Sequence, residues 1–358
     1  MFPFIALFLV DPAALMSSRT AAPIEPRTST VFRGRENESA FNLHTYLAHH
    51  GGLFYAAWSS AAVGEEDPDQ HIVYATSSDG HTWSAPQILA PDPDGPAGHK
   101  RWITRGLFVE NNRLRALGAL VESADYDQRG RGIVWKNLAL HAFTFTNKHW
   151  RSDGPIALDA MNNFPPTRID GRYLMPARDA SMKMSVLAAA KLAPNAWSAT
   201  PLFSEPPFHR LDEPTLYEAA DRTLHIIIRD GARSGRLLRV ISTDRGLTWS
   251  HPVQTDFPDA TSKNFVTRIS TGAYVLINNP NPKARDPLSL ALSPDGWQFS
   301  QPTPVRHGAP PRRYAGRAKG SGTFQYPHAI EHNGSLWIIY STNKEDIEIS
   351  EIPVSSLH

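Results

Sequence analysis

Pairs of short apolar runs recur along the chain, each pair flanking a turn rich in Gly, Asn and Asp. This pattern is typical of a β-hairpin, in which two antiparallel strands flank a tight turn. It predicts six hairpins, at residues 42–58, 102–120, 162–178, 213–229, 263–278 and 325–341. The 30 prolines argue against long helices, because an interior proline removes a backbone donor and clashes with the preceding turn. We therefore expect an all-β protein.

A second repeat runs in phase with the hairpins. It consists of an aromatic residue, a serine soon after it and then a proline, and it begins at Trp83, Trp150, Trp197, Trp249 and Phe299. Its mean period is about 54 residues, which is the size of a four-stranded propeller blade. Closing six blades into a ring removes the exposed edges of small sheets. The sequence therefore predicts a six-bladed β-propeller, with a two-sheet β-sandwich as the alternative.

One segment lies outside the repeats, at the N-terminus. Residues 1–10 form an apolar run that is too short to span a bilayer as a helix. The run has the size of a signal-peptide core, although no Lys or Arg precedes it. We expect residues 1–30 to form an N-terminal segment and residues 31–358 a single propeller domain. The compartment stays open: a signal peptide within residues 1–20 would place the protein in the periplasm or outside the cell.

Charge and composition exclude several classes of function. The 36 Lys and Arg nearly balance the 35 Asp and Glu, so a general electrostatic grip on nucleic acid or an anionic membrane is not expected. The absence of cysteine excludes disulfides, thiolate zinc sites and a cysteine nucleophile. No phosphate-binding glycine loop or paired metal-binding motif is present. We expect no nucleic-acid partner, no stable membrane insertion and no required cofactor; a structural calcium or zinc ion stays open, with His99, His328 and His332 as weak candidates.

The turns before two of the tryptophans share a motif. Residues 77–83 are SSDGHTW and residues 242–249 are STDRGLTW, with a weaker copy, SPDGWQF, at 293–299. In each turn the Asp can accept hydrogen bonds from the turn backbone, and the Gly can adopt a positive φ. These turns resemble the Asp-box, or BNR, repeats of the sialidase superfamily. The resemblance implies a sialidase-like six-bladed propeller whose Asp boxes are structural, so the chemistry must lie elsewhere.

Polar residues stand near the starts of the otherwise apolar hairpins. Because the inner strands of a propeller run along its central channel, we expect these residues to meet at one mouth of the channel. They are Asn42, His44, Trp102, Arg105, Asn163, Asp212, Glu213, Lys263, Asn264, Tyr326 and His328. The ends of the second strands add two Arg-Asp pairs, at 178–179 and 229–230. The alternative interpretation is that these pairs are ion pairs between blades and that the other residues are structural.

The resemblance to sialidases implies roles for several of these residues. Tyr326 is similar in place to the tyrosine nucleophile, and Glu213 to the glutamate that polarises it. Arg229 and Arg285 are similar to members of the arginine group that holds the substrate carboxylate, a task for which planar guanidinium groups are suited. The acidic loop 65–69 would supply the general acid, with Asp67 as the candidate. A tyrosine needs such a neighbouring carboxylate, because its ordinary pKa of about 10 makes it a poor nucleophile.

The chain also departs from the sialidase pattern. The Arg-Ile-Pro motif of the first blade is replaced by residues 41–46, FNLHTY, so the first arginine is missing; Arg33, Arg35 or Arg178 could substitute for it. Pro327 follows Tyr326, where sialidases usually have Ser. Other segments resemble propeller lyases of rhamnose–glucuronate and ulvan polysaccharides, in which a His or Tyr removes the C5 proton of a uronate. That second resemblance implies a base and an acid among His44, His99, Tyr326 and His328.

Three functions therefore follow from the sequence. The first is exo-hydrolysis of an acidic sugar from a glycan, in the manner of an exo-α-sialidase, with Tyr326, Glu213, His44 and Asp67 as catalytic candidates. Its substrate-binding candidates are Arg229, Arg285, Arg178, Arg105, Asn163, Lys263 and His328. A uronate-specific lyase is a near second, and a non-catalytic propeller that binds glycans or proteins is the third. The basic loop 312–319 is either solvated or a lid that attracts an acidic glycan.

Overall fold

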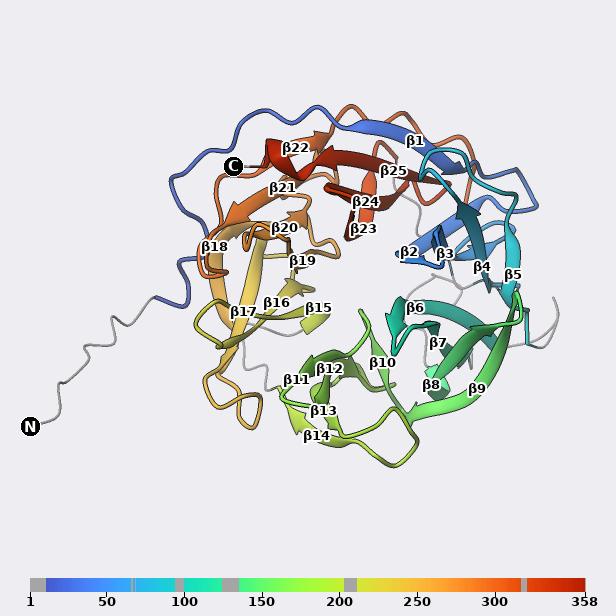
Figure 1. Cartoon of the computed structure of the whole chain (residues 1–358), viewed down its shortest axis with the longest axis horizontal. Helices are drawn as coiled ribbons and strands as arrows, with labels where there is room; N and C mark the ends of the chain where they lie inside the picture. The colour runs from blue at the N-terminus through green and yellow to red at the C-terminus, as the bar shows by residue number, and fades with distance from the viewer. Residues whose placement is uncertain are drawn as a thin grey trace, which may run out of the picture.

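Six antiparallel sheets surround one axis in the computed structural model (Figure 1). The structure describes residues 11–65, 67, 69–93, 100–123, 135–202, 211–316 and 321–357. Each sheet is one blade, and its first strand lies nearest the axis. The prediction of an all-β, six-bladed propeller with one hairpin at the start of each blade is confirmed. Within the described ranges the only helix is a 3-10 turn at Val354–Ser356.

The strands follow the chain from blade to blade. Blade 1 contains β2 (Phe41–His50), β3 (Leu53–Ala61), β4 (His71–Ser77) and β5 (Gln87–Ala90), and blade 2 contains β6 (Lys100–Glu110), β7 (Arg113–Ser123), β8 (Trp135–Thr146) and β9 (His149–Leu158). Blade 3 contains β10 (Met161–Asn162), β11 (Thr167–Ile169), β12 (Arg172–Arg178), β13 (Met184–Ala189) and β14 (Ser198–Pro201). In blade 3 both β10 and β11 pair with β12, so its inner strand is divided in two.

The last three blades complete the ring. Blade 4 contains β15 (Leu211–Glu218), β16 (Leu224–Asp230), β17 (Arg236–Ser242) and β18 (Val253–Pro258), and blade 5 contains β19 (Phe265–Arg268), β20 (Tyr274–Asn278), β21 (Leu288–Ser293) and β22 (Thr303–Arg306). Blade 6 contains β23 (Phe324–His332), β24 (Ser335–Thr342) and β25 (Asp346–Pro353). Its fourth strand is the N-terminal β1 (Arg27–Phe32), which pairs with β25 and closes the propeller.

Apolar side chains fill the spaces between adjacent blades. Between blades 1 and 2, for example, Tyr46 and Ile72 pack with Trp102 and Leu114 in one buried cluster. Comparable clusters lie between each of the other neighbouring pairs. The core is therefore a ring of thin layers between sheets, which leaves the inner strands free to present other side chains along the axis.

The Asp boxes fasten each of their blades to the preceding one. Asp79 Oδ1 accepts hydrogen bonds from the backbone amides of His81 and Thr82, at 2.8 and 2.7 Å. Asp244 and Asp295 make the same kind of bond in blades 4 and 5. The glycine of each box has a positive φ and faces the neighbouring blade: a Cβ on Gly246 would lie 2.7 Å from Leu174. The expected structural role of these turns is thus supported by their contacts.

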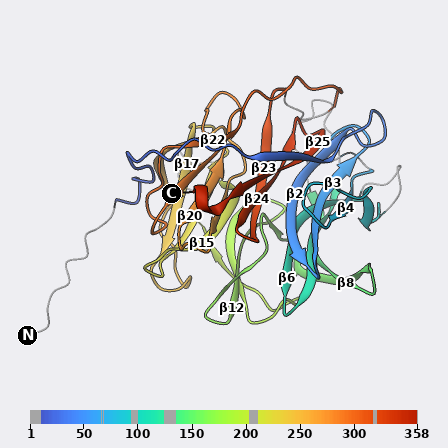
Figure 2. The same ribbon diagram turned by 45° about the horizontal axis from the view of Figure 1, so that its top comes forward.

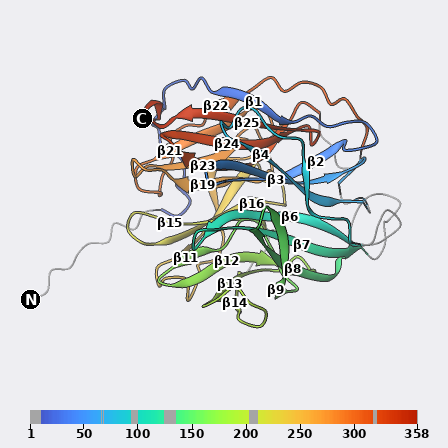
Figure 3. The same ribbon diagram turned by 45° about the vertical axis from the view of Figure 1, so that its right-hand side comes forward.

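The chain runs around the edge of blades 4 to 6 before β1 begins (Figures 1, 2 and 3). We call the first part of this run, residues 11–19, the N-terminal strap. Leu15 is fully buried among Tyr217, Phe257 and Phe299, and its amide donates to Asp256 at 2.8 Å. The fully buried Arg239 donates to the carbonyls of Pro12 at 2.7 Å and Ala14 at 3.1 Å. The strap therefore belongs to the packed propeller, N-terminal to the expected domain start at residue 31.

The contact between an Asp box and its neighbouring blade can be tested with two glycines that share a backbone conformation. Gly246 has φ +85° and faces Leu174, whereas Gly154 has φ +83°, and a Cβ added to it would have no atom within 4 Å. We expect G154A to lower the free energy of unfolding by about 1 kcal/mol through backbone strain alone, and G246A by about 3 kcal/mol because crowding adds to the strain. Urea unfolding measures both values. Equal losses would show that the box does not fasten the blades.

The strap can be tested by truncation. Removing residues 1–20 deletes Leu15, whose burial stabilises the fold by about 2 kcal/mol. It also removes the carbonyls of Pro12 and Ala14 that accept hydrogen bonds from Arg239, at a further cost of about 1–3 kcal/mol. We expect a lower denaturation midpoint in urea than for the full chain. The matched control removes only residues 1–10 and retains every contact described for the strap. Equal midpoints for the two truncations would contradict a structural role for residues 11–19.

Candidate functional site

Four inner strands are irregular at the same depth along the axis. The pairing register of β2, β6, β15 and β23 shifts at His44, Arg105, Glu213 and Tyr326. His44, Glu213 and Tyr326 have φ values of 57°, 48° and 62°. Such values are uncommon outside glycine, cost about 1–3 kcal/mol each and concentrate at functional sites. Bulges also redirect side chains, so the irregularities place these polar groups together.

Glu213, Arg229 and Tyr326 meet across the channel. Arg229 Nη1 lies 2.5 Å from Glu213 Oε2 and 3.4 Å from Tyr326 Oη. The Tyr326 hydroxyl also donates a hydrogen bond to Glu213. These residues come from blades 4 and 6, 97 positions apart in the case of Arg229 and Tyr326. The structure thus brings Tyr326 to a pair of residues that lie far from it in the sequence.

The protonation states of this trio follow from its charges. Burial alone would raise the pKa of Glu213, but the Arg229 charge and the hydrogen bonds from Tyr326 and Arg229 outweigh it and lower the pKa to about 2. Burial, reinforced by the negative charge of Glu213, raises the pKa of Tyr326 well above its usual value. At neutral pH the carboxylate is therefore ionised and the phenol is protonated, which is the state needed for Glu213 to accept the phenolic proton.

Cationic side chains from four consecutive blades gather around the trio. Arg178 forms an ion pair with Asp212, which lies 3.8 Å from Arg229. The Arg285 guanidinium lies 5.8 Å from the centre of the Tyr326 ring, and Lys344 Nζ lies 6.0 Å from it. Arg285 donates to two uncharged groups, the Gln325 side chain and the Thr261 carbonyl. Carboxylates therefore offset the charges of Arg178 and Arg229, whereas the hydrogen-bond partners of Arg285 are uncharged and leave its charge in place.

Blade 1 adds a histidine and a glutamate. The His44 ring meets the Tyr326 ring edge to face at 5.1 Å, and its Nε2 lies 3.8 Å from Glu65 Oε1. Its buried Nδ1 has no hydrogen-bond partner among the described residues. Burial, assisted by the charges of Arg105 and Lys263, holds the pKa of His44 well below its usual value. The imidazole is therefore neutral and can act as a base.

The mouth also contains Glu65, from the acidic loop expected to supply the general acid, and Lys344, which the sequence analysis did not name. Glu65 forms an ion pair with Lys344, which is 5% exposed and lies in the turn between β24 and β25. The signal that could have indicated Lys344 is the missing arginine of blade 1, which called for another cation nearby. The expected general acid Asp67 instead accepts a bond from the Gly64 amide at 2.6 Å. Glu66 and His99 lie outside the described residues.

Other candidates form the floor beneath the site. Lys263 is fully buried, with its Nζ 3.1 Å from Tyr46 Oη and 4.2 Å from the centre of the Phe164 ring. Burial holds the pKa of Lys263 well below its usual value. Tyr46 donates to the Asn163 carbonyl at 2.5 Å and is also hydrogen-bonded to Arg105. These groups stabilise the floor rather than line the open mouth.

His328 and the basic loop lie elsewhere. His328 faces the opposite end of the channel, where its Nδ1 accepts the Leu47 amide at 3.2 Å. Arg313, from the loop expected to be solvated or a lid, pairs with Asp346 and contacts Glu345, while Arg317 and Lys319 lie outside the described residues. Of the remaining candidates, Arg105, Asn163 and Arg178 line a small cavity next to Glu213, of about 10 Å³.

A metal site and a membrane-spanning helix each have structural requirements, against which the described residues can be set. No group of three or more His, Asp or Glu side chains suitable for a metal ion occurs in the described part of the chain. The same residues contain no helix of the length and apolarity that a membrane crossing requires.

The chain matches a known family over most of its length. Residues 52–338 match the family described as BNR repeat-like domain. The chain belongs to this family. The Asp boxes and the six blades of this BNR repeat-like propeller agree with that membership, and its fold is that of the sialidase superfamily. No curated protein matches the chain.

Solved structures share the fold of this BNR repeat-like propeller. A sialidase has 23% identity and a TM-score of 0.66, with 93% of this chain and 33% of that chain covered. An intramolecular trans-sialidase from Ruminococcus gnavus has 13% identity and a TM-score of 0.66, with 92% and 98% covered. A protein of unknown function from Dyadobacter fermentans has 14% identity and a TM-score of 0.69, with 93% and 98% covered. The chain thus spans about a third of the first structure, and these identities show a common fold alone.

The Glu213–Arg229 pair predicts how stability depends on pH. The lowered pKa of Glu213, from 4.5 to about 2, stabilises the folded state above pH 4.5, and this contribution is lost as the pH falls towards 2. The full shift corresponds to roughly 3 kcal/mol. We expect E213Q to be less stable than the wild type at pH 7, because Arg229 loses its anion, and the difference to shrink between pH 5 and pH 2. Urea unfolding across this range measures it; a difference that does not vary with pH would contradict the assignment.

Proposed function

We propose that this propeller is a glycan-processing enzyme that removes a terminal, carboxylate-bearing sugar by exo-hydrolysis, with a sialic acid as the first candidate. The observation that carries the proposal is the Tyr326–Glu213–Arg229 trio, in which Tyr326 and Glu213 stand, like the neighbouring His44, at bulges with a positive φ, and which is surrounded by cations. A structural role would not require three polar residues with positive φ at one depth of the channel. The sialidase and trans-sialidase among the similar structures support this class of substrate.

Tyr326 is the proposed nucleophile. Its Oη attacks the anomeric carbon while Glu213 accepts its proton, and the bond from that carbon to the leaving-group oxygen breaks. An acid protonates the leaving oxygen, and water then hydrolyses the glycosyl–tyrosine bond with the same residue acting as base. A phenol is uncharged before attack, so it approaches an anionic sugar without the repulsion that a carboxylate nucleophile would meet. The hydrogen bond between Tyr326 and Glu213 is the contact that this proton transfer needs.

Arg285 is the proposed main partner of the substrate carboxylate. Three of the other cations already have carboxylate partners: Arg178 pairs with Asp212, Arg229 with Glu213 and Lys344 with Glu65. An incoming anion gains most from a charge that is not yet compensated, and a guanidinium can hold it through two parallel hydrogen bonds. Arg229 and Arg178 would then add donors from neighbouring blades.

We assign the acid and base step to Glu65 in preference to Asp67. Glu65 lies beside His44 and Lys344, close enough to Tyr326 for its charge to affect that phenol. Asp67 is engaged by its own loop through the Gly64 amide. When the substrate displaces Lys344 from its ion pair with Glu65, the Glu65 carboxylate would take up a proton from water and, as the neutral acid, donate it to the leaving oxygen.

The lyase alternative is favoured by one specific observation, the neutral His44 beside Tyr326. In a β-elimination, His44 would take the C5 proton of a uronate, the C4–O bond would break with a double bond forming between C4 and C5, and Tyr326 would protonate the leaving oxygen. Arg285 would neutralise the carboxylate and so make the C5 proton more acidic. The two reactions share a site but give different products.

Product analysis separates these functions. We expect free acidic sugar to appear from a sialoside panel, without the ultraviolet absorbance of a 4,5-unsaturated uronate from uronate polysaccharides. Unsaturated product would replace the hydrolase proposal with the lyase. Binding without turnover of either class, unchanged in Y326F and E213Q, would support the non-catalytic propeller.

The proposed roles of the site residues predict losses of activity of different size in three variants. Y326F should lower kcat/KM at least about a thousandfold because the nucleophile is removed, and E65Q about a hundredfold because the proton donor is lost. D67N is the matched control, an acidic residue two positions away, and should retain activity within a few fold. A larger loss in D67N than in E65Q would return the acid and base step to Asp67. Thermal unfolding of each variant checks that the fold is retained.

A further inference from the structure

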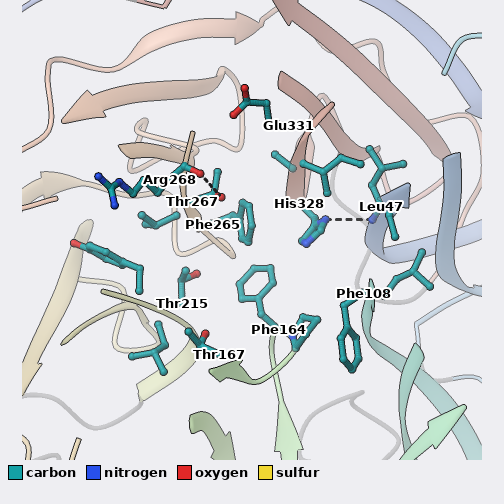
Figure 4. Close-up of a pocket in the computed structure, with 18 of the residues that line it drawn as sticks. Leu47, Phe108, Phe164, Thr167, Thr215, Phe265, Thr267, Arg268, His328 and Glu331 are labelled. Carbon is teal, nitrogen blue, oxygen red and sulfur yellow. Dashed lines mark hydrogen bonds between the residues drawn. The ribbon is translucent and has the colours of Figure 1, made fainter. Parts of the chain in front are cut away.

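A second cavity opens at the other end of the channel (Figure 4). Its volume is about 600 Å³, and residues from the inner strands of all six blades line it. Small-molecule sites usually have volumes of about 300–1,000 Å³. The cavity lies towards the C-terminal ends of the inner strands, whereas Tyr326 and Glu213 lie near the N-terminal ends. It is therefore distinct from the candidate active site.

Aromatic rings form the bottom of this cavity. The rings of Phe164 and Phe265 are 4.8 Å apart between centres, and His328 lies 4.7 Å from Phe265. Figure 4 shows the three side chains gathered in the middle of the view. Lys263 contacts Phe164 and is fully buried, so it does not line the cavity. This aromatic layer separates the cavity from the active-site floor, so a chain-like ligand cannot pass from one mouth to the other.

His328 contributes a polar group aimed at the cavity. Its side chain is 6% exposed, and its Nδ1 accepts the Leu47 amide, so the ring proton must be on Nε2. No described residue accepts a hydrogen bond from this Nε2. Burial, with the nearby charge of Lys263, lowers the pKa of His328 to about 3, so the ring stays neutral at ordinary pH. A nearly buried N–H without an acceptor is costly unless a ligand or water supplies one.

The rim of the cavity is polar but carries no strong excess of one charge. Thr167 and Thr267 bring hydroxyl groups, and Arg268 and Glu331 bring opposite charges. Glu331 is already bonded to the amide of Ser270 at 2.6 Å, and Arg268 to the Gly272 carbonyl at 3.2 Å. The rim therefore offers several hydrogen-bonding groups, and the charges of Arg268 and Glu331 are opposite in sign, so this pair does not favour an ion over a neutral ligand. This differs from the cation-rich mouth at the opposite end.

We propose that this cavity binds an uncharged sugar ring, with its apolar face against Phe164 and Phe265 and one hydroxyl oxygen accepting the Nε2 proton of His328. A pyranose presents one face of C–H groups and a rim of hydroxyls, which matches an aromatic base beneath threonine and ionic side chains. A purely aromatic ligand would leave the His328 donor unused, and an acidic sugar would have to desolvate its carboxylate at a wall where Arg268 is offset by Glu331. The site does not depend on the proposed catalytic function.

The test uses the full chain and saturation-transfer NMR with methyl glycosides of glucose, galactose and rhamnose, followed by titration of the one that binds. We expect a neutral glycoside to bind, and glucuronate and indole to bind at least tenfold more weakly. F265L, which keeps an apolar side chain but removes the flat ring, should weaken binding at least tenfold. F145L, an aromatic substitution of the same kind in blade 2, and Y326F should leave affinity unchanged.

A second variant protects the test against a fold defect. T267K places a long charged side chain at the cavity rim without altering the aromatic base, and it should also weaken binding at least tenfold. The proposal is overturned if none of the three glycosides binds at millimolar concentration, or if indole or glucuronate binds more tightly than they do. It is also overturned if Y326F abolishes binding while F265L and T267K do not, because the sugar would then occupy the catalytic mouth.

Discussion

The pairing of β1 with β25 is the interaction on which the arrangement of this molecule depends. Without it, blade 6 would end at an unpaired strand and the ring would have an open seam between its first and last blades. Closure fixes the distance of every inner strand from the axis. Side chains that are far apart in the sequence, such as those of His44, Glu213 and Tyr326, can then meet at a constant separation. The strap adds contacts to blades 4 and 5 and so anchors the segment that leads into β1.

The electrostatics of the proposed catalytic mouth explain how an almost neutral protein can favour an anionic ligand. Most of the cations there are matched by carboxylates from the same or a neighbouring blade, which limits the cost of burying them. Arg285 differs because amide and carbonyl oxygens hold it in place without cancelling its charge. The opposite mouth has aromatic rings and balanced charges instead. One channel thus ends in two chemically different surfaces, divided by the Tyr46, Lys263 and Phe164 layer.

The fold could be predicted from the sequence because its signals are local and repeated: turns such as Gly51-Gly52 and Asn333-Gly334 have the positive φ values that tight hairpins require. The proximity of Glu213 and Arg229 could also be read from their spacing across one hairpin, since antiparallel pairing keeps such residues adjacent. His328 was misplaced for a physical reason. On a regular strand, residues two positions apart lie on the same face. The bulge at Tyr326 shifts the register, so Tyr326 and His328 serve different ends of the channel. Glu65 and Lys344 lie in loops without a motif, and only the closed ring brings them together.

The strap and β1 also have a consequence for biosynthesis. They are the first described part of the chain to leave the ribosome, yet their partners are among the last: the Leu15 amide bonds to Asp256, and Thr28 lies beside Ser350. During translation, therefore, the N-terminal strand must stay unpaired until blade 6 has emerged. Contacts of such long sequence separation slow folding, and an unpaired strand is open to association with other chains. The same closure that pairs β25 in the finished propeller thus makes the nascent chain dependent on protection until blade 6 is made.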